Sequence, residues 1–302
     1  MTLVLDLGQS GARLRWPGGE HTTTRAKLAA ESVVETLRDI FTEFRSAHPD
    51  AQIHESIALS CTGFDGKVPD PLYYGLLGQE FFGAREVAVI DDGLAGFFGA
   101  MNGQDGVTLS IGSGAVAVGG RRGVFSHADG LGHIFGDEGS GYWLGKHALE
   151  RALATRQGRE NDPMLLEFLA EAMVEFDALE STVDAQAQSL CIATAKRVLE
   201  AAENNISSAV AIRDRGAEQL SKTVVAAWTK AGGMRNESLT LTLLGGLAKN
   251  REYEEVIRRH VSYSLPQMRL DMAKGNHLDG GLLITQTMKE EYAPLLRWWR
   301  AS

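Results

Sequence analysis

Residues 130–145 have the sequence Gly-Leu-Gly-His-Ile-Phe-Gly-Asp-Glu-Gly-Ser-Gly-Tyr-Trp-Leu-Gly, in which six of the sixteen positions are glycine. Glycine lets a backbone approach a ligand closely and adopt positive φ. The carboxylates Asp137 and Glu138 and the aromatic residues Tyr142 and Trp143 lie among these glycines, which is unlike a flexible linker. Either the acidic pair caps a helix that starts near Tyr142, or the stretch is a polar pocket floor where a carboxylate holds a hydroxylated ligand.

The composition is that of an ordinary globular protein, with 44% hydrophobic and 23% charged residues. A chain of 302 residues is longer than one core usually serves, so we expect two domains. The net charge of −9, without a basic run, argues against nucleic acid as a partner. The two cysteines, Cys61 and Cys191, form no CxxC pair, which favours a reducing, cytoplasmic location. No apolar run approaches the length of a membrane span, so we expect no membrane partner.

Hydrophobic periodicity predicts an α/β protein in which strands and helices alternate. The predicted strands cover residues 2–7, 12–16, 21–25, 53–61, 86–90, 107–111, 116–120, 124–127, 239–244 and 267–272. The predicted helices cover residues 30–47, 72–82, 94–101, 142–156, 163–176, 183–202, 207–230, 250–263, 278–289 and 295–301.

The same order of elements occurs twice, because each half opens with three short strands and then alternates helix and strand. We therefore expect an N-terminal domain at residues 1–103, completed by residues 278–302. The second domain would cover residues 104–277 and include a helical insertion. Two such domains would face each other across a cleft, where ligands usually bind.

Glycine-rich turns open both halves. The first, Asp6-Leu-Gly-Gln-Ser-Gly11, joins two predicted strands, and its backbone N–H groups and Ser10 hydroxyl suit a phosphate. Asp6 could hold Mg²⁺ through water. No GKS or GKT follows, which excludes a Walker P-loop. The second turn, Gly112-Ser-Gly114, repeats the arrangement, so the pair could bind one polyphosphate; the alternative is two β-turns without a ligand.

Asp91 and Asp92 lie between a predicted strand and a predicted helix. One of them would cap the helix, and the other would remain at the carboxyl end of a strand, where α/β sheets carry their ligands. Such a carboxylate can accept the proton of an attacking hydroxyl. Gly245 and Gly246 follow another buried strand and could let the backbone approach a flat ring, or they could form a packing turn.

Five motifs together resemble the N-acetylglucosamine kinase branch of the sugar kinase/actin-like ATPase superfamily, which includes the benzoyl-CoA reductase activator-type ATPases. The motifs are Asp-x-Gly-x-Ser, strand–Asp-Asp–helix, strand–Gly-Ser-Gly, Gly-Asp-Glu-Gly-Ser-Gly-Tyr-Trp and Leu-Gly-Gly-x-x-x-Asn. The resemblance implies two ribonuclease-H-like domains that close on ATP and a sugar. It implies an ATP-dependent kinase that uses Mg²⁺ and phosphorylates an amino sugar, most simply N-acetyl-D-glucosamine or D-glucosamine.

The resemblance also assigns roles to single residues. Asp92 matches the catalytic base, and the sugar would contact Asp92, Gly114, Ala115 and Asp137. The nucleotide would contact Gly8, Gln9, Ser10, Ser113, Gly216, Gly245, Gly246 and Asn250. The expected partners are a small sugar and a second copy of the chain in a homodimer.

Three positions depart from the family pattern, which usually has Gly-Thr in place of Gln9-Ser10, Asn in place of Asp91 and Trp in place of Leu131. The last substitution leaves the choice between hexose and hexosamine open. Two other classes are considered: a sugar- or nucleotide-binding protein without turnover, which Gln9 and Asp91 would favour, and a reductase-activating ATPase. The latter needs cluster-binding cysteines, which Cys61 and Cys191 do not supply.

Overall fold

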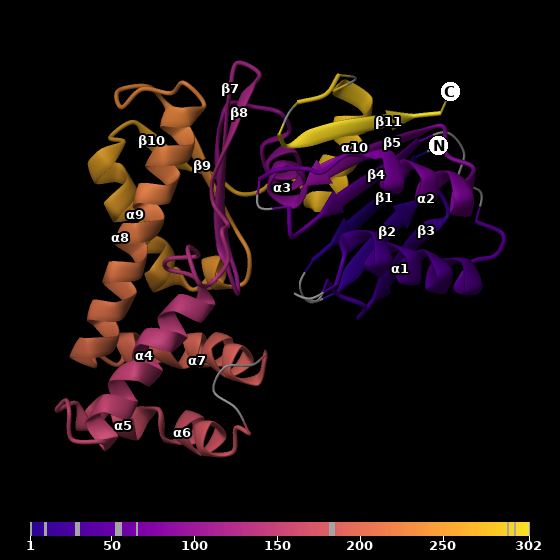
Figure 1. Cartoon of the computed structure of the whole chain (residues 1–302). Coiled ribbons are helices and arrows are strands. Elements are labelled where there is room, and N and C mark those ends of the chain that lie inside the picture. Colours follow the sequence, from indigo (N-terminus) through magenta and orange to yellow (C-terminus); the bar gives the residue numbers. More distant parts are fainter. Residues whose placement is uncertain are drawn as a thin grey trace. The chain divides into compact units, whose positions relative to one another are not determined.

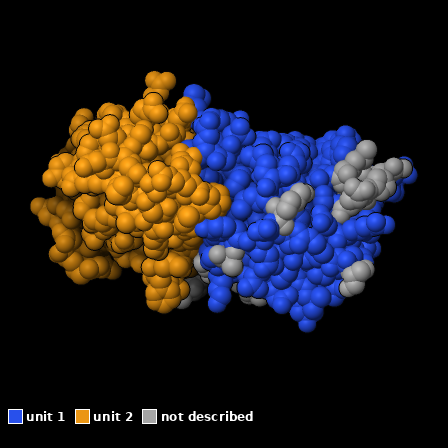
Figure 2. Space-filling model, turned by 90° about the horizontal axis from the view of Figure 1, so that it is seen from above, with its two compact units in different colours: residues 1–104, 272–302 blue, residues 105–271 orange. Residues whose placement is uncertain are grey.

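The computed structural model describes residues 2–8, 11–27, 31–51, 56–64, 66–180, 185–288, 290–292 and 294–301. The chain forms two compact units, coloured separately in Figure 2. Unit 1 contains Met1–Gln104 and Met272–Ser302, and unit 2 contains Asp105–Asp271. The polypeptide therefore leaves unit 1 after its first hundred residues and returns to it for its last thirty.

Unit 1 is built on a six-stranded mixed sheet in the order β11-β5-β4-β1-β2-β3. Its strands are β1 (Thr2–Leu7), β2 (Ala12–Trp16), β3 (Gly19–Thr23), β4 (Ser56–Cys61), β5 (Glu86–Asp91) and β11 (Leu296–Arg300). Strands β1, β4 and β5 are parallel to one another, whereas β2, β3 and β11 are antiparallel to their neighbours. The parallel strands are nearly continuous hydrophobic runs, as expected for strands buried on both faces.

Alternate side chains of these strands pack against different helices. Leu3, Leu5 and Leu7 belong to one core with α1 (Val33–Ala47) and α2 (Leu72–Phe82). Val4 points to the opposite face, where α10 (His277–Thr287) approaches so closely that a Cβ built on Gly281 would lie 2.7 Å from Val4 Cγ1. The remaining helix of unit 1, α3 (Asp92–Met101), packs against α10 (Figure 1).

Unit 2 contains a five-stranded sheet in the order β10-β9-β6-β7-β8. Its strands are β6 (Gly106–Ile111), β7 (Ala115–Arg121), β8 (Val124–Asp129), β9 (Leu239–Leu244) and β10 (Met268–Leu270). Its helices are α4 (Gly141–Arg156), α5 (Pro163–Phe168), α6 (Ala170–Asp177), α7 (Ala185–Glu203), α8 (Ser207–Lys230) and α9 (Arg251–Ser264), with a 3₁₀ turn at Leu247–Lys249. Helices α8 and α9 pack in the sheet's core together with parts of α4 and α7, and a second core lies among α4–α7 and the start of α8 (Figure 1).

The two sheets have the same topology once β11 is set aside. In each, three antiparallel strands that are consecutive in the chain are followed by two strands added in parallel on the other side of the first. This order, 3-2-1-4-5, is that of a ribonuclease-H-like sheet and confirms the expected α/β class with two similar halves.

Two sequence-based predictions were wrong. Residues 295–301 were predicted as a helix, but Leu296–Arg300 form strand β11, which pairs antiparallel with β5. Leu296 and Trp298 are buried while Arg297 is not, so the period is two residues rather than three or four. The helix predicted at 163–176 is divided at Leu169 into α5 and α6.

In the ranges that the structure describes, no helix combines the length and the apolar character that a membrane span needs.

Candidate active site

Three carboxylates of unit 1 gather at the carboxyl edge of its parallel strands. The register pairs Leu7 with Cys61 and Cys61 with Asp91, so β1, β4 and β5 end at the same level of the sheet. Asp6 precedes Leu7, and Asp92 follows Asp91. The Cys61 thiol lies among them, since burial and the charges of Asp92, Asp6 and Asp91 together raise its pKa.

Asp91 is the N-cap of helix α3. Its side chain accepts hydrogen bonds from the backbone N–H of Gly93 at 3.1 Å and of Gly66 at 3.2 Å, and the residue is 1% exposed. These donors belong to the helix's first turn and to a neighbouring loop, so Asp91 holds the two together. Asp91 is therefore the capping aspartate of the pair, and Asp92 is the one that does not cap the helix.

Asp92 is the first residue of α3 and is partly buried. Burial, with the negative charge of Asp91 next in importance, raises the pKa of the Asp92 carboxyl to about 7. Asp6 adds to this rise, whereas His277 and a 2.9 Å hydrogen bond from the Gly93 N–H oppose it. A carboxyl group with a pKa near neutrality at the end of a parallel strand suits proton transfer.

The first glycine turn is only partly described. Gly8 N–H donates to the Gly11 carbonyl at 2.9 Å, which closes the turn between β1 and β2. Asp6 accepts a hydrogen bond from Arg13 Nη2 at 2.6 Å. Gln9 and Ser10, predicted to contact phosphates, lie outside the described residues.

The second turn, Gly112–Gly114, is tied to the start of helix α4. Gly112 N–H donates to the Gly114 carbonyl at 2.9 Å. The N–H groups of Gly141 and Tyr142 donate to the carbonyls of Gly112 and Ser113 at 2.8 and 3.1 Å. The turn that contains Ser113 is thus fixed by the first residues of α4.

Asp137 lies beside this turn in unit 2. It is 8% exposed and has a positive φ of 59°, which is uncommon for a residue with a side chain. Its Oδ1 accepts a hydrogen bond from the Ala115 N–H at 3.0 Å, and its own N–H donates to Asp129 Oδ1 at 2.8 Å. A Cβ built on Gly114 would lie 2.8 Å from Asp137 Oδ2, so Gly114, Ala115 and Asp137 form one cluster.

The N-cap of α4 is Ser140, whose side chain accepts a hydrogen bond from the Trp143 N–H at 3.2 Å. The hypothesis that Asp137 and Glu138 cap this helix was therefore wrong. A serine immediately before the first helical residue is a usual cap signal, and Ser140 lies at that place in the sequence. The buried Asp137 carboxylate has its contacts in the β6–β7 turn instead.

The residues assigned to the nucleotide have structural contacts within unit 2. Gly216 is buried on α8, where a Cβ would lie 2.9 Å from the Tyr253 hydroxyl. Gly245 has a φ of 93° and lies against the Ile111 backbone, and Gly246 precedes the 3₁₀ turn. Asn250 caps α9 through the Tyr253 N–H and donates to Glu203 at 2.8 Å. Their assignment to a nucleotide stays a prediction.

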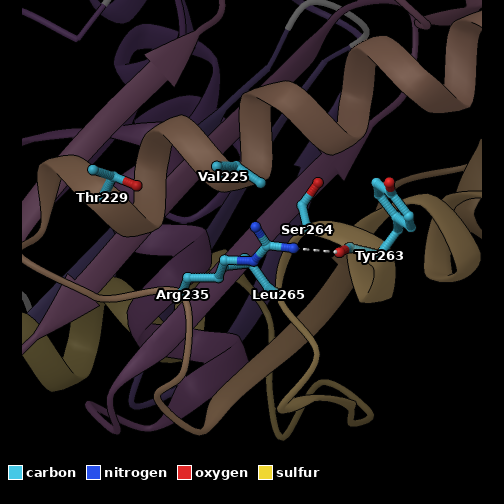
Figure 3. A pocket seen from close by; sticks show the side chains of 6 residues that line it. All are labelled: Val225, Thr229, Arg235, Tyr263, Ser264 and Leu265. Carbon is cyan, nitrogen blue, oxygen red and sulfur yellow. Dashed lines mark hydrogen bonds between the residues drawn. The ribbon is translucent and has the colours of Figure 1, made fainter.

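Two surface pockets of unit 2 lie away from these residues. One, of about 260 Å³, is lined by Val225, Thr229, Arg235, Tyr263, Ser264 and Leu265 (Figure 3). Arg235 there donates to the Tyr263 carbonyl at 3.3 Å. Another, of about 570 Å³, lies between α4 and α8 and includes Trp143, His147 and Arg215. The residues predicted to bind ligand, as far as the structure describes them, line neither pocket.

The duplicated sheet topology and the buried carboxylates at strand ends define an actin-like ATPase fold. The family model described as BadF/BadG/BcrA/BcrD ATPase family matches residues 3–275, and the chain belongs to this family.

A relative from Clostridium acetobutylicum named N-acetylmuramic acid/N-acetylglucosamine kinase is 25% identical over 210 residues, 67% of this chain and 68% of that protein. Similar solved structures include proteins provisionally assigned as N-acetylglucosamine kinases. That from Porphyromonas gingivalis has a TM-score of 0.70 at 15% identity, covering 95% of this chain and 99% of the other. The structure from Chromobacterium violaceum has a TM-score of 0.67 at 21% identity, and the match covers 94% of this chain and 98% of the other. A Streptomyces griseus ROK family glucokinase, solved with glucose and AMPPNP, has a TM-score of 0.59 at 17% identity. The match covers 94% of this chain and 98% of the glucokinase. These structures show the fold.

The raised pKa of Asp92 predicts a pH-dependent loss of stability. The unfolded chain releases this proton near its ordinary pKa of 3.8, whereas the folded protein keeps it until about pH 7. Stability therefore falls as the pH rises through this window. Asp92→Asn should remove the penalty and raise the free energy of unfolding by roughly 1–3 kcal/mol at pH 8, and much less at pH 4. Denaturant unfolding at both pH values measures this change in the free energy of unfolding. The exposed Asp50→Asn is the control, and an Asp92→Asn effect equal at both pH values would contradict the interpretation.

The assignment of the α4 cap predicts that Ser140→Ala lowers the free energy of unfolding by about 1–2 kcal/mol, because the Trp143 N–H loses its acceptor in a buried position. Ser46→Ala is the matched control, since Ser46 is exposed and donates only to the Thr42 carbonyl of its own helix. Chemical denaturation compares the two. Equal effects would show that Ser140 is not the important cap.

Proposed function

We propose that the protein is an ATP-dependent kinase that phosphorylates a hydroxyl of an amino sugar, N-acetyl-D-glucosamine or D-glucosamine. The observation that carries the proposal is Asp92, a partly buried carboxyl with a pKa of about 7 at the end of a parallel strand. Membership of an ATPase family supports the use of ATP, and the named activity of the C. acetobutylicum relative supports a sugar as acceptor.

In the proposed reaction, Asp92 accepts the proton of the sugar hydroxyl while that oxygen forms a bond to the γ-phosphorus of ATP. The bond between this phosphorus and the β–γ bridging oxygen breaks, ADP leaves, and the proton later passes from Asp92 to water. Phosphoryl transfer needs mainly positioning and charge neutralisation. A base that is half ionised near pH 7 can take up the proton at physiological pH without a large energetic cost.

Asp137 is the proposed sugar ligand in unit 2. One of its oxygens is oriented by the Ala115 N–H, and its backbone is held by Asp129. A carboxylate fixed in this way can accept hydrogen bonds from two adjacent sugar hydroxyls, with Gly114 and Ala115 lining the same place. Such a site discriminates strongly, since a missing hydroxyl leaves buried charge without a partner.

The phosphates are proposed to contact Gly8, Gln9, Ser10 and Ser113, and the rest of the nucleotide Gly216, Gly245, Gly246 and Asn250. Within the described residues, no group of three or more His, Cys, Asp or Glu side chains is placed to hold a metal ion by itself. A Mg²⁺ bound with ATP takes most of its oxygens from phosphate and water and needs one or two carboxylates. Asp6 fits that requirement, and the ion would neutralise charge on the phosphates.

The reductase-activating role remains the less favoured alternative within the family. The two cysteines lie in different units, Cys61 within the core of unit 1 and Cys191 on helix α7, and a cluster site needs several thiolates together. The cytoplasmic location and the homodimer stay predictions.

The direct test is ADP release from ATP and Mg²⁺ with N-acetylglucosamine, glucosamine, glucose and N-acetylmuramic acid, each at saturating concentration. Sugar-dependent ADP release with an amino sugar supports the proposal. Thermal stabilisation by sugar or nucleotide without ADP release would instead indicate a binding protein without turnover, and release without any sugar would indicate a simple ATPase.

The base assignment predicts that Asp92→Asn reduces kcat by roughly 10²–10⁴-fold while the dissociation constants for ATP and sugar change little. Asp91→Asn should cost much less activity, because an amide can still accept from the Gly93 N–H and no longer repels the Asp92 carboxylate. Steady-state kinetics and calorimetric titrations measure both. If Asp91→Asn is inactive and Asp92→Asn is active, the two roles are reversed.

The ligand assignment predicts that Asp137→Asn keeps most of the folding stability but loses the thermal stabilisation that the sugar gives. The fall in kcat/KM for sugar should be roughly 10²-fold or more, since a charged acceptor is removed from a buried site. Thermal shift with and without sugar measures it, and Ser140→Ala, which should keep sugar binding, is the control. If the sugar stabilises Asp137→Asn as much as it stabilises the wild type, Asp137 is not a sugar ligand.

A further inference from the structure

Helices α3 and α10 of unit 1 come into backbone contact, although they are separated by about 180 residues of chain. A Cβ built on Gly99 would lie 2.0 Å from the Asn276 carbonyl oxygen, and one on Gly280 would lie 1.8 Å from the Ala95 carbonyl oxygen. No larger residue fits at either position without moving a backbone. The start of α10 is therefore held at a fixed place on α3.

The first residue of α10 is His277, and the turn around it is rigid. Asn276 caps the helix by accepting from the Leu278 N–H at 2.9 Å, and its own N–H donates to Asp279 Oδ2 at 2.7 Å, which completes a capping box. Asp279 is in turn paired with Arg15 of strand β2 at 2.6 Å. The backbone that carries His277 is thus tied to both α3 and the sheet.

The imidazole of His277 lies over Gly96, where a Cβ would be 2.8 Å from the ring Nε2. Gly96 follows Asp92 by four residues on α3, so both positions share one face of that helix. The absence of a side chain at Gly96 lets the ring lie against the helix one turn from the Asp92 carboxylate. His277 is one of the groups that act electrostatically on Asp92, and it opposes the effect of burial.

We propose that His277 is a positioning residue for Asp92, and that its imidazole holds this carboxylate ionised so that it can accept the proton of the sugar hydroxyl. The inference rests on the proposed role of Asp92 as the base. His277 acts through Asp92 rather than on the substrate. In the proposal, the imidazole opposes the effect of the negative charges of Asp91 and Asp6 on Asp92.

The groups that face Asp92 come from four elements. Asp91 ends β5, Asp6 lies in β1, Cys61 ends β4 and His277 starts α10. Asp6 is paired with Arg13, and Asp91 is held by two backbone N–H groups. The negative charges of both aspartates raise the pKa of the Asp92 carboxyl. Among these groups His277 acts in the opposite direction and lowers the pKa of the Asp92 carboxyl.

The test is the pH dependence of kcat/KM for sugar in three variants. His277→Gln removes the charge at similar size, so Asp92 protonates more readily and the acid limb moves to higher pH. We expect kcat/KM about three- to tenfold below wild type at pH 6, corresponding to a shift of about 0.5–1 unit, with recovery above pH 8.5. His277→Lys keeps a positive charge and should keep the acid limb of the wild type or lower it.

Gly96→Ala probes the geometry without changing any polar group. The new methyl group would displace the imidazole, and we expect the acid limb to move in the same direction as in His277→Gln. Alanine is also the better helix former, by about 1 kcal/mol, which favours folding of this variant. His147→Gln, on α4 of unit 2, is the matched control and should leave the profile unchanged.

A second measurement needs no catalysis. The carboxyl ¹³C resonance of Asp92, assigned by its loss in Asp92→Asn, is titrated in the wild type and in His277→Gln. An upward move of its apparent pKa in the variant supports the inference even if no sugar is phosphorylated, in which case the proposed function alone fails. An unchanged carboxyl titration, or an activity loss in His277→Gln that is equal at pH 6 and pH 9, overturns the role of His277.

Discussion

The parallel pairing of β1, β4 and β5 is the constraint on which the candidate active site depends. Parallel strands bring their carboxyl ends to one edge, and this register sets Leu7, Cys61 and Asp91 side by side. Three carboxylates then lie around a buried thiol, at an electrostatic cost. The backbone N–H groups of Gly93 and Gly66, with Arg13, offset much of that cost for Asp91 and Asp6. The pKa of the Asp92 carboxyl is raised first by burial and then by the charge of Asp91.

Unit 2 repeats the topology with different side chains at the corresponding places. Its first turn, Gly112–Gly114, is held by the N–H groups of Gly141 and Tyr142, so the helix that follows the glycine-rich stretch supports the turn that precedes it. Asp137 completes this arrangement through the Ala115 N–H. One scaffold therefore carries a carboxylate with raised pKa in unit 1 and an oriented, backbone-bonded carboxylate in unit 2.

The return of the chain to unit 1 gives the last residues a role beyond closing the sheet. Helix α10 packs against α3 at glycine positions, and its first side chain reaches the face of α3 that carries Asp92. The electrostatic environment of Asp92 is thus set by elements from both ends of the sequence. A loose packing of these helices would leave the carboxylate with its negative neighbours alone and disfavour its ionised form.

The sequence by itself determined the α/β class and the duplicated order of strands, and it indicated where the candidate site would lie. Continuous apolar runs predict buried strands, and carboxylates and glycine turns mark the ends of several of them. It also indicated that one of Asp91 and Asp92 would cap a helix. The sequence-based prediction was wrong at residues 295–301. The segment Leu-Arg-Trp-Trp-Arg is a strand whose buried and less buried side chains alternate where it pairs with β5.

The Ser140 cap of α4 is local in the sequence, but only the tertiary structure decided that the Asp137 carboxylate accepts from the Ala115 N–H, 22 residues earlier in the chain. The same holds for His277, which has no local signal and lies against Gly96, one helical turn from Asp92, through the contact of α3 with α10. Local patterns specify what a segment can form. Hydrogen bonds and charges between segments distant in the chain depend on packing, which no single segment encodes.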